Sequence, residues 1–236
     1  MIELEIQFKG KALAGVLGAF QNVPLSMRPV QFGANEGRVD GAVDSAEFPE
    51  FVERAKSGFF LIAPDVYYDV SIFPTKGKII CRGWISKEAV PVETFLLDMT
   101  SAEPTFGFAC ATDERDHRNC VKVQARDGDL SAWVGRDPNN TFPGLYWLTL
   151  FSPELLERYN FPMQTFRSAA TDSVRTESGY WLIKFFELPE SWLQHDQMMR
   201  SLISGTPGIF DIEAVKQGLP KTDRVLELSS YLSRWK

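Results

Sequence analysis

The feature that most constrains the fold is a nearly unbroken apolar run from Leu145 to Phe151. Its length is that of a strand rather than a helix, and its aromatic side chains favour extended backbone. Because the run is apolar on both faces, we expect the strand to lie in the middle of a sheet.

The residues that follow this run predict a short capped helix. Ser152 can cap its first turn, Pro153 fits the first helical position, and Glu154 complements the positive end of the helix dipole. A second segment, Gly179 to Phe186, partly repeats the order of Gly144 to Phe151, with Gly followed by Tyr-Trp-Leu and then Phe. We expect the two segments to form neighbouring core strands.

Other parts of the chain mix strand and helix patterns. Residues Ile2 to Phe8 alternate, which predicts a half-buried strand with Glu3, Glu5 and Gln7 facing outward. A short Gly-containing link at 75–77 predicts a hairpin, and the tail from Val225 to Trp235 keeps helical spacing and should dock. The mixture without strict βαβ alternation predicts an α+β fold, with mainly antiparallel sheets covered by helices on one side.

The segment 113–143 differs from its surroundings because it is charged and rich in turn-forming residues. Within it only 121–125 and 130–134 resemble strands. We expect an N-terminal α+β subdomain over residues 1–112, an excursion or linker over 113–143, and a C-terminal α+β subdomain over 144–236. One continuous sheet is the alternative.

Composition excludes several functional classes. The net charge of −6 argues against a nucleic-acid binder, which usually carries a basic stripe. Three cysteines without CxxC spacing make a disulfide framework or a cysteine-rich zinc site unlikely to form. The sequence has neither a signal-peptide pattern at its start nor an apolar run long enough to cross a membrane, so we expect a cytoplasmic protein without membrane contact.

Catalytic and cofactor motifs are missing from the sequence. His195 with Asp196, or His117 with Asp113 or Asp116, could be imagined as a base and its orienting acid, but a surface histidine is the simpler interpretation. Neither phosphate-binding glycine motif is present, and the acids lack metal-ligand spacing, so we expect no cofactor and no metal. Dispersed carboxylates leave a hydrolase or glycan-acting enzyme as an alternative, with four tryptophans that could line a sugar site: Trp133, Trp147, Trp181 and Trp192.

The acidic residues of 113–143 are the candidates for partner recognition. An exposed acidic loop could enter the basic cleft of a cationic enzyme, although interleaved arginines and lysines dilute its charge. The candidate partner-binding residues are Asp113, Glu114, Asp116, Asp127, Asp129 and Asp137.

The segment Gly144-Leu145-Tyr146-Trp147-Leu148-Thr149-Leu150-Phe151-Ser152-Pro153-Glu154-Leu155 resembles one found in bacterial immunity proteins of polymorphic toxin systems. In those proteins a Pro-Gly turn leads into an aromatic strand and then a short helix. The resemblance implies a cytoplasmic protein that binds a cognate toxin, such as a type VI-delivered or Rhs-type effector, and blocks it by occlusion without chemistry of its own. It assigns no functional residue, and the oligomeric state stays open. A structural component that acts by self-association is a third hypothesis.

Overall fold

The computed structural model describes residues 1–86 and 91–235 and is built on one sheet of ten strands. The strand order in this sheet is β11-β12-β10-β7-β1-β6-β5-β4-β2-β3, and β8 and β9 form a separate hairpin. The strands are β1 (Ile2–Lys9), β2 (Gln31–Gly33), β3 (Gly41–Ala42), β4 (Gly58–Ile62), β5 (Val66–Phe73), β6 (Lys78–Ile85), β7 (Phe106–Ala111), β8 (Cys120–Ala125), β9 (Gly128–Trp133), β10 (Leu148–Phe151), β11 (Asp172–Arg175) and β12 (Trp181–Lys184). The α-helices are α1 (Leu13–Ala19), α2 (Phe48–Arg54), α3 (Val92–Asp98), α4 (Thr112–Asn119), α5 (Pro153–Tyr159), α6 (Met163–Ala169), α7 (Trp192–Ser204), α8 (Ile212–Gln217) and α9 (Val225–Leu232).

The strand pairings confirm the predicted α+β class. Every pairing within the ten-stranded sheet is antiparallel, including the hairpin of β5 and β6 around residues 74–77. Strand β10 lies between β7 and β12, so the two aromatic segments are neighbouring core strands, as predicted. The regular strand begins only at Leu148, because the chain turns at Tyr146, whose N–H donates to Thr149 Oγ1 at 2.9 Å. Ser152 caps α5 through a bond from the Leu155 N–H.

The pairing of β7 with β10 carries the sheet across the segment 113–143. Strands from residues 1–112 and from residues 144–236 therefore share one sheet. The boundaries of two subdomains remain a prediction about which parts of the chain fold independently.

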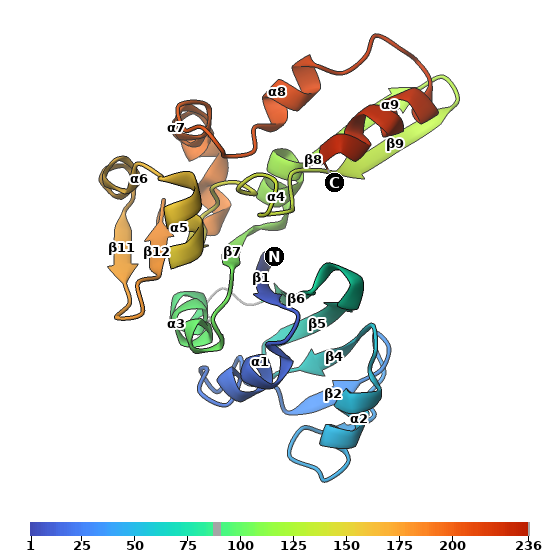
Figure 1. The fold of residues 1–236 in the computed structure, drawn as a ribbon, viewed down its shortest axis with the longest axis vertical. Coiled ribbons are helices and arrows are strands. Elements are labelled where there is room, and N and C mark those ends of the chain that lie inside the picture. The colour runs from blue at the N-terminus through green and yellow to red at the C-terminus, as the bar shows by residue number, and fades with distance from the viewer. Residues whose placement is uncertain (87–90, 236) are drawn as a thin grey trace.

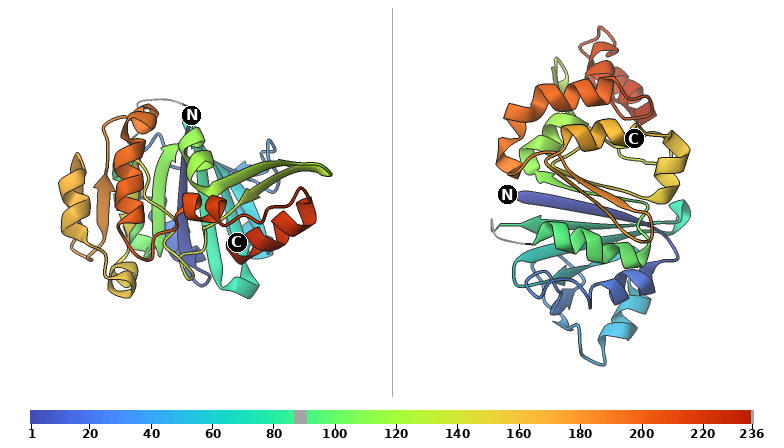
Figure 2. Two further views of the ribbon diagram at one scale, coloured as in Figure 1. Left: turned by 90° about the horizontal axis from the view of Figure 1, so that it is seen from above. Right: turned by 90° about the vertical axis from the view of Figure 1, so that its left-hand side faces the viewer.

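Helix α3 packs on β7 and β12 opposite α4 to α7, so this part of the sheet has helices on both faces, whereas β4, β5 and β6 have helices on one face (Figure 2). Helices α1, α2 and α3 pack on the face that presents Phe59 and Tyr68, through Phe20, Phe48 and Phe95. Helices α4 to α7 lie on the other face, where Phe151 stacks on Phe166 of α6.

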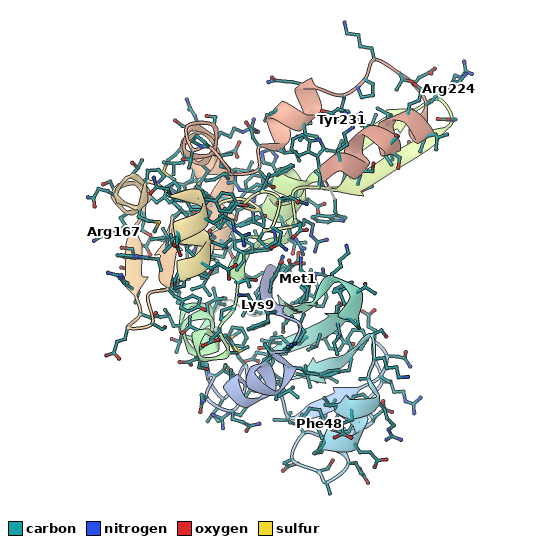
Figure 3. The ribbon with its side chains drawn as sticks, viewed as in Figure 1. Met1, Lys9, Phe48, Arg167, Arg224 and Tyr231 are labelled. Atoms are coloured by element: carbon teal, nitrogen blue, oxygen red, sulfur yellow. The ribbon has the colours of Figure 1, made fainter. Side chains whose placement is uncertain are left out.

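The segment 113–143 is not a linker without structure. It forms α4, β8 and β9, and the hairpin packs with α8 and α9 around a small apolar core of its own. We call β8, β9, α8 and α9 the arm. It projects away from the body at the upper right of Figure 1, with Arg224 and Tyr231 at the opposite end of the molecule from Phe48 of α2 (Figure 3). The C-terminal helix docks in this arm, as predicted.

The shared sheet predicts a single cooperative unfolding transition for the whole chain. Urea unfolding followed by tryptophan fluorescence and by far-ultraviolet circular dichroism should give coincident curves. Two separate transitions would instead support independent folding of residues 1–112 and 144–236.

Candidate functional site

The polar side of β1 forms the centre of the candidate site. The expectation that Glu3, Glu5 and Gln7 face solvent is wrong, because these residues are only 4%, 1% and 1% exposed. Helix α4 and the segment that follows β9 cover them, while the apolar side of the same strand packs against the other layer. A central strand with a buried polar side needs partners for each of its charges.

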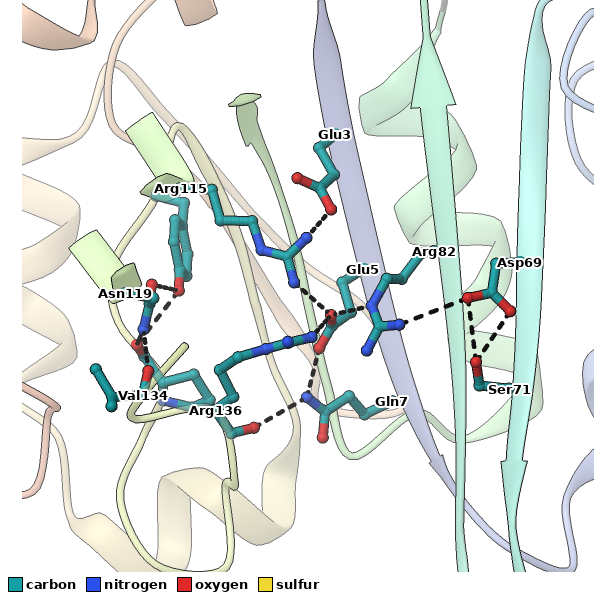
Figure 4. A network of polar contacts seen from close by, with 12 residues as sticks. Glu3, Glu5, Gln7, Asp69, Ser71, Arg82, Arg115, Asn119, Val134 and Arg136 are labelled. Carbon is teal, nitrogen blue, oxygen red and sulfur yellow. Dashed lines mark hydrogen bonds and ion pairs between the residues drawn. The ribbon is translucent and has the colours of Figure 1, made fainter. Parts of the chain in front are cut away.

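Glu5 meets those needs through three arginines (Figure 4). Its Oε2 accepts from Arg82 Nε at 2.9 Å, Arg115 Nη2 at 2.9 Å and Arg136 Nη2 at 2.8 Å. Its Oε1 accepts from Gln7 Nε2 at 2.7 Å. The arginines come from β6, from α4 and from the segment after β9, so one carboxylate joins three separate parts of the chain.

Two further carboxylates complete the cluster. Arg115 also pairs with Glu3, and Arg82 Nη1 lies 3.5 Å from Asp69 Oδ2. With Glu5 and Arg136, the cluster therefore holds three acids and three arginines. The guanidinium groups of Arg115 and Arg136 also lie over the ring of Trp133, at 4.9 and 5.6 Å from its centre. We call the following residues the Glu5 cluster: Glu3, Glu5, Gln7, Asp69, Arg82, Arg115 and Arg136.

Glu5 and Arg115 are ionised at neutral pH. Burial acts to raise the pKa of Glu5, but Arg136 and Arg82 more than offset it, so the pKa lies below its usual value. Burial and the nearby Arg136 lower the pKa of Arg115 to about 10. Both groups stay charged, and the bonds to Glu5 leave it poorly suited to act as a general acid or base. The arrangement favours holding a surface in place over moving protons.

The segment after β9 is fixed at several points. Gly135 has φ +66, and a Cβ there would overlap the ring of Phe210, so the turn requires glycine. Pro138 O accepts from Arg158 Nη1 at 3.2 Å and from Tyr159 OH at 3.0 Å.

Asn119, at the end of α4, fastens the same region from the inside. Its Nδ2 donates to Val134 O and Pro143 O, both at 3.1 Å, and its Oδ1 accepts from Tyr146 OH at 2.5 Å (Figure 4). The base of the arm is therefore tied to the body by buried hydrogen bonds as well as by ion pairs.

An open cleft of about 690 Å³ lies where the arm meets the sheet. One side comes from β1 and β6, and the other from β9 and the segment after it. The lining residues are Glu5, Lys76, Lys78, Ile80, Arg82, Ser131, Ala132, Trp133, Arg136, Asp137 and Asn139. Of the four tryptophans singled out from the sequence, Trp133 is the one in this cleft, whereas Trp147 is a buried core residue.

The six acidic candidates do not act as one exposed loop. Glu114 is fully buried and accepts from Arg118 Nε at 2.9 Å, so its side chain makes no surface contact in this conformation. Asp116 pairs with Lys122, Asp127 accepts from the Val225 N–H at the start of α9, and Asp137 caps the turn at Asn139. Asp113 and Asp129 are exposed, on α4 and at the start of β9. Partner binding by this set stays a prediction.

The two histidines lie in different surroundings. His117 faces Asp196, with Nε2 3.4 Å from Oδ1, and also contacts Arg200 Nη2 at 2.9 Å. His195 stacks on Phe186 at 5.0 Å. Burial lowers the pKa of His117 and Asp196 partly opposes it, which favours the neutral ring. The space beside His117 is only about 20 Å³, too small for a substrate.

Metal binding and membrane crossing find no support in the described part of the chain. Residues 1–86 and 91–235 contain no group of three or more His, Cys, Asp or Glu placed to hold a metal ion. Over the same residues, no helix is both long and apolar enough to cross a bilayer.

Comparison with known proteins gives no relative. No protein family matches this chain, and no curated protein or solved structure is detectably similar to it.

Sequence reasoning missed the arginines of the Glu5 cluster and the lysines of the cleft. Arg82, Arg115 and Arg136 are 77, 110 and 131 residues from Glu5 along the chain. The available signal was the acidic alternation of β1, which is unusual for a strand placed between two others.

Replacing Glu5 with Gln should destabilise the fold by about 3–5 kcal/mol, because three arginines lose their shared countercharge. Chemical denaturation measures the change. Glu50→Gln is the matched control, because its side chain is 71% exposed and pairs with the equally exposed Arg54, so it should change stability by less than about 0.5 kcal/mol. Equal stabilities of the two variants would contradict the structural role of Glu5.

Glu114 should make stability depend on pH. Burial raises its pKa from 4.5 to about 7, with Arg118 opposing the rise. A raised folded-state pKa gives stability that is complete below the unfolded value and is lost as pH rises through about 7. Between about pH 5 and pH 8, the unmodified chain should lose on the order of 2–3 kcal/mol of its free energy of unfolding through Glu114. Glu114→Gln should not show this loss. Parallel stability profiles for the two proteins would contradict this assignment.

Proposed function

We propose that this chain is an immunity protein that binds a cognate bacterial toxin in the cytoplasm and occludes its activity. The toxin would be of the type VI-delivered or Rhs-type class. The observation that carries the proposal is the open cleft at the base of the arm, whose walls the Glu5 cluster holds in place. The resemblance of residues 144–155 to immunity proteins supports the same class.

A fixed surface suits tight binding without chemistry. A binding site that is already ordered loses less conformational entropy when its partner docks. The cleft presents Trp133 together with Arg82 and Arg136, and tryptophan and arginine are the residue types that most often dominate binding energy. The buried bonds of the cluster keep both arginines in position before the partner arrives.

Occlusion requires a contact area larger than the cleft alone. A stable complex typically buries on the order of 1,600 Å² in total. The exposed sheet surface beside the cleft can extend the contact, because Phe60, Tyr67 and Trp84 form a half-buried row there. The overall charge of −6 favours encounter with a partner whose surface is basic on average.

The test is protection against the toxin encoded beside this chain. Co-expression should restore growth, and the tagged chain should retain the toxin as a one-to-one complex. A toxin variant without catalytic activity should be retained equally well, because the proposed binding does not depend on the toxin's chemistry.

Trp133→Ala should weaken retention of the toxin by at least about tenfold, as expected for a central aromatic contact. Trp235→Ala, a change to a partly exposed tryptophan that follows α9 and lies outside the cleft, is the control and should leave retention unchanged. The proposal would be wrong if the folded chain neither binds nor protects against any toxin that is encoded beside it.

A further inference from the structure

The cleft at the base of the arm is positively charged on an acidic protein. Its lining includes four cations, Lys76, Lys78, Arg82 and Arg136, and two acids, Glu5 and Asp137, which leaves a formal surplus of two positive charges. The whole chain carries −6. The cleft therefore differs in sign from the protein as a whole.

Lys78 is the half-buried cation of the cleft that lacks a direct ion-pair partner among the described residues. It is half-buried at the start of β6, and its ammonium group makes no ion pair or hydrogen bond with any residue that the structure describes. Burial lowers the pKa of Lys78, Asp137 and Glu5 oppose the shift, and Arg136 and Lys76 add to it. A partly desolvated cation beside two others is unfavourable unless an anion joins it.

The nearby carboxylates of Asp137 and Glu5 oppose the shift, but neither makes a direct ion pair with Lys78. The Glu5 carboxylate accepts from three arginines and Gln7, and the Asp137 carboxylate accepts from the backbone and side chain of Asn139. Lys76, on the turn between β5 and β6, is exposed and likewise has no ion pair with any described residue. Both lysines line the same side of the cleft.

We propose that the cleft receives an acidic segment of the partner protein, whose carboxylates pair with Lys78, Lys76 and the outer edge of Arg136. Carboxylates give these cations the charge-assisted hydrogen bonds that the free chain does not provide. The open shape of the cleft, between a sheet and a projecting arm, can admit a loop or strand of another protein.

Nucleic acid is a weaker match to the same cations. Single-stranded nucleic acids bind by stacking successive bases on several aromatic side chains, whereas Trp133 is the one aromatic side chain among the described residues that line the cleft. The overall charge of −6 would also repel a long polyanion. A short acidic segment gains from the local charge and avoids most of that repulsion.

This inference deepens the proposed function and depends on it for the assumption that the occupant is a protein. It adds the place on the surface and the chemistry of the segment. A toxin that is basic on average would then carry an acidic loop. The acidic chain would attract the basic toxin, and the basic cleft would pair with the acidic loop, which together would fix the orientation of the complex.

The experiment uses the full chain and a short fluorescein-labelled peptide of alternating Glu and Ser, with binding followed by fluorescence anisotropy at low salt. The chain should bind this peptide more tightly than a Gln/Ser peptide of equal length, and added salt should weaken the binding. Lys78→Gln should weaken it by about tenfold, the effect of losing one charge-assisted contact.

Lys56→Gln is the matched control, because Lys56 is exposed just after α2 and is not among the residues that line the cleft. It should leave binding of the Glu/Ser peptide unchanged. The thermal midpoint of Lys78→Gln should equal or exceed that of the unmodified chain, which separates loss of binding from loss of fold.

Four results would overturn the inference. They are no binding of the Glu/Ser peptide, equal binding of the Gln/Ser peptide, unchanged binding by Lys78→Gln, or tighter binding of oligothymidylate of equal charge. A chain that protects against a toxin but ignores the Glu/Ser peptide would keep the proposed function and lose this inference. A chain that binds the peptide through Lys78 but protects against no toxin would do the reverse.

Discussion

The carboxylate of Glu5 is the constraint on which the rest of the structure depends. It lies on a strand that pairs on both sides and is buried on both faces, so it cannot reach solvent. An ionised carboxylate in such a place is tolerated only when countercharges and hydrogen bonds surround it. Arg82, Arg115 and Arg136 meet that requirement from three elements, and in doing so they fix β6, α4 and the base of the arm relative to β1.

The cleft follows from this arrangement. The three arginines are matched by three acids, whereas Lys76 and Lys78 are left without an ion pair among the residues described here. The arginines that stabilise the fold thus lie next to the lysines that can bind a partner. Helices α4 to α7 do not extend over β5 and β6, which leaves the side of these strands that carries Asp69 and Arg82 open next to the arm (Figure 1). Folding and partner recognition therefore meet in one region.

Local sequence patterns predict the helices and strands better than they predict which side chains meet in the folded chain. The capped helix after Phe151, the hairpin of β5 and β6, the docking of the tail and the adjacency of β10 and β12 all follow from short-range signals. The burial of Glu3, Glu5 and Gln7 does not, because alternation marks a polar side without saying what covers it. Their partners lie up to 131 residues away along the sequence. No local pattern predicts helix α4, because its residues are mostly charged. For the same reason the sequence predicts Glu114 as a surface acid, although the turn of α4 directs it inward against Arg118.

The most direct test of the central claim is amide hydrogen exchange in the full chain with and without Glu5→Gln. If Glu5 holds the arm to the sheet, the variant should lose more protection in β8, β9 and residues 134–147 than in α1 and α2, beyond the loss that its lower global stability causes throughout the chain. Unchanged protection in the arm, or an equal loss of protection in α1 and α2, would contradict the account.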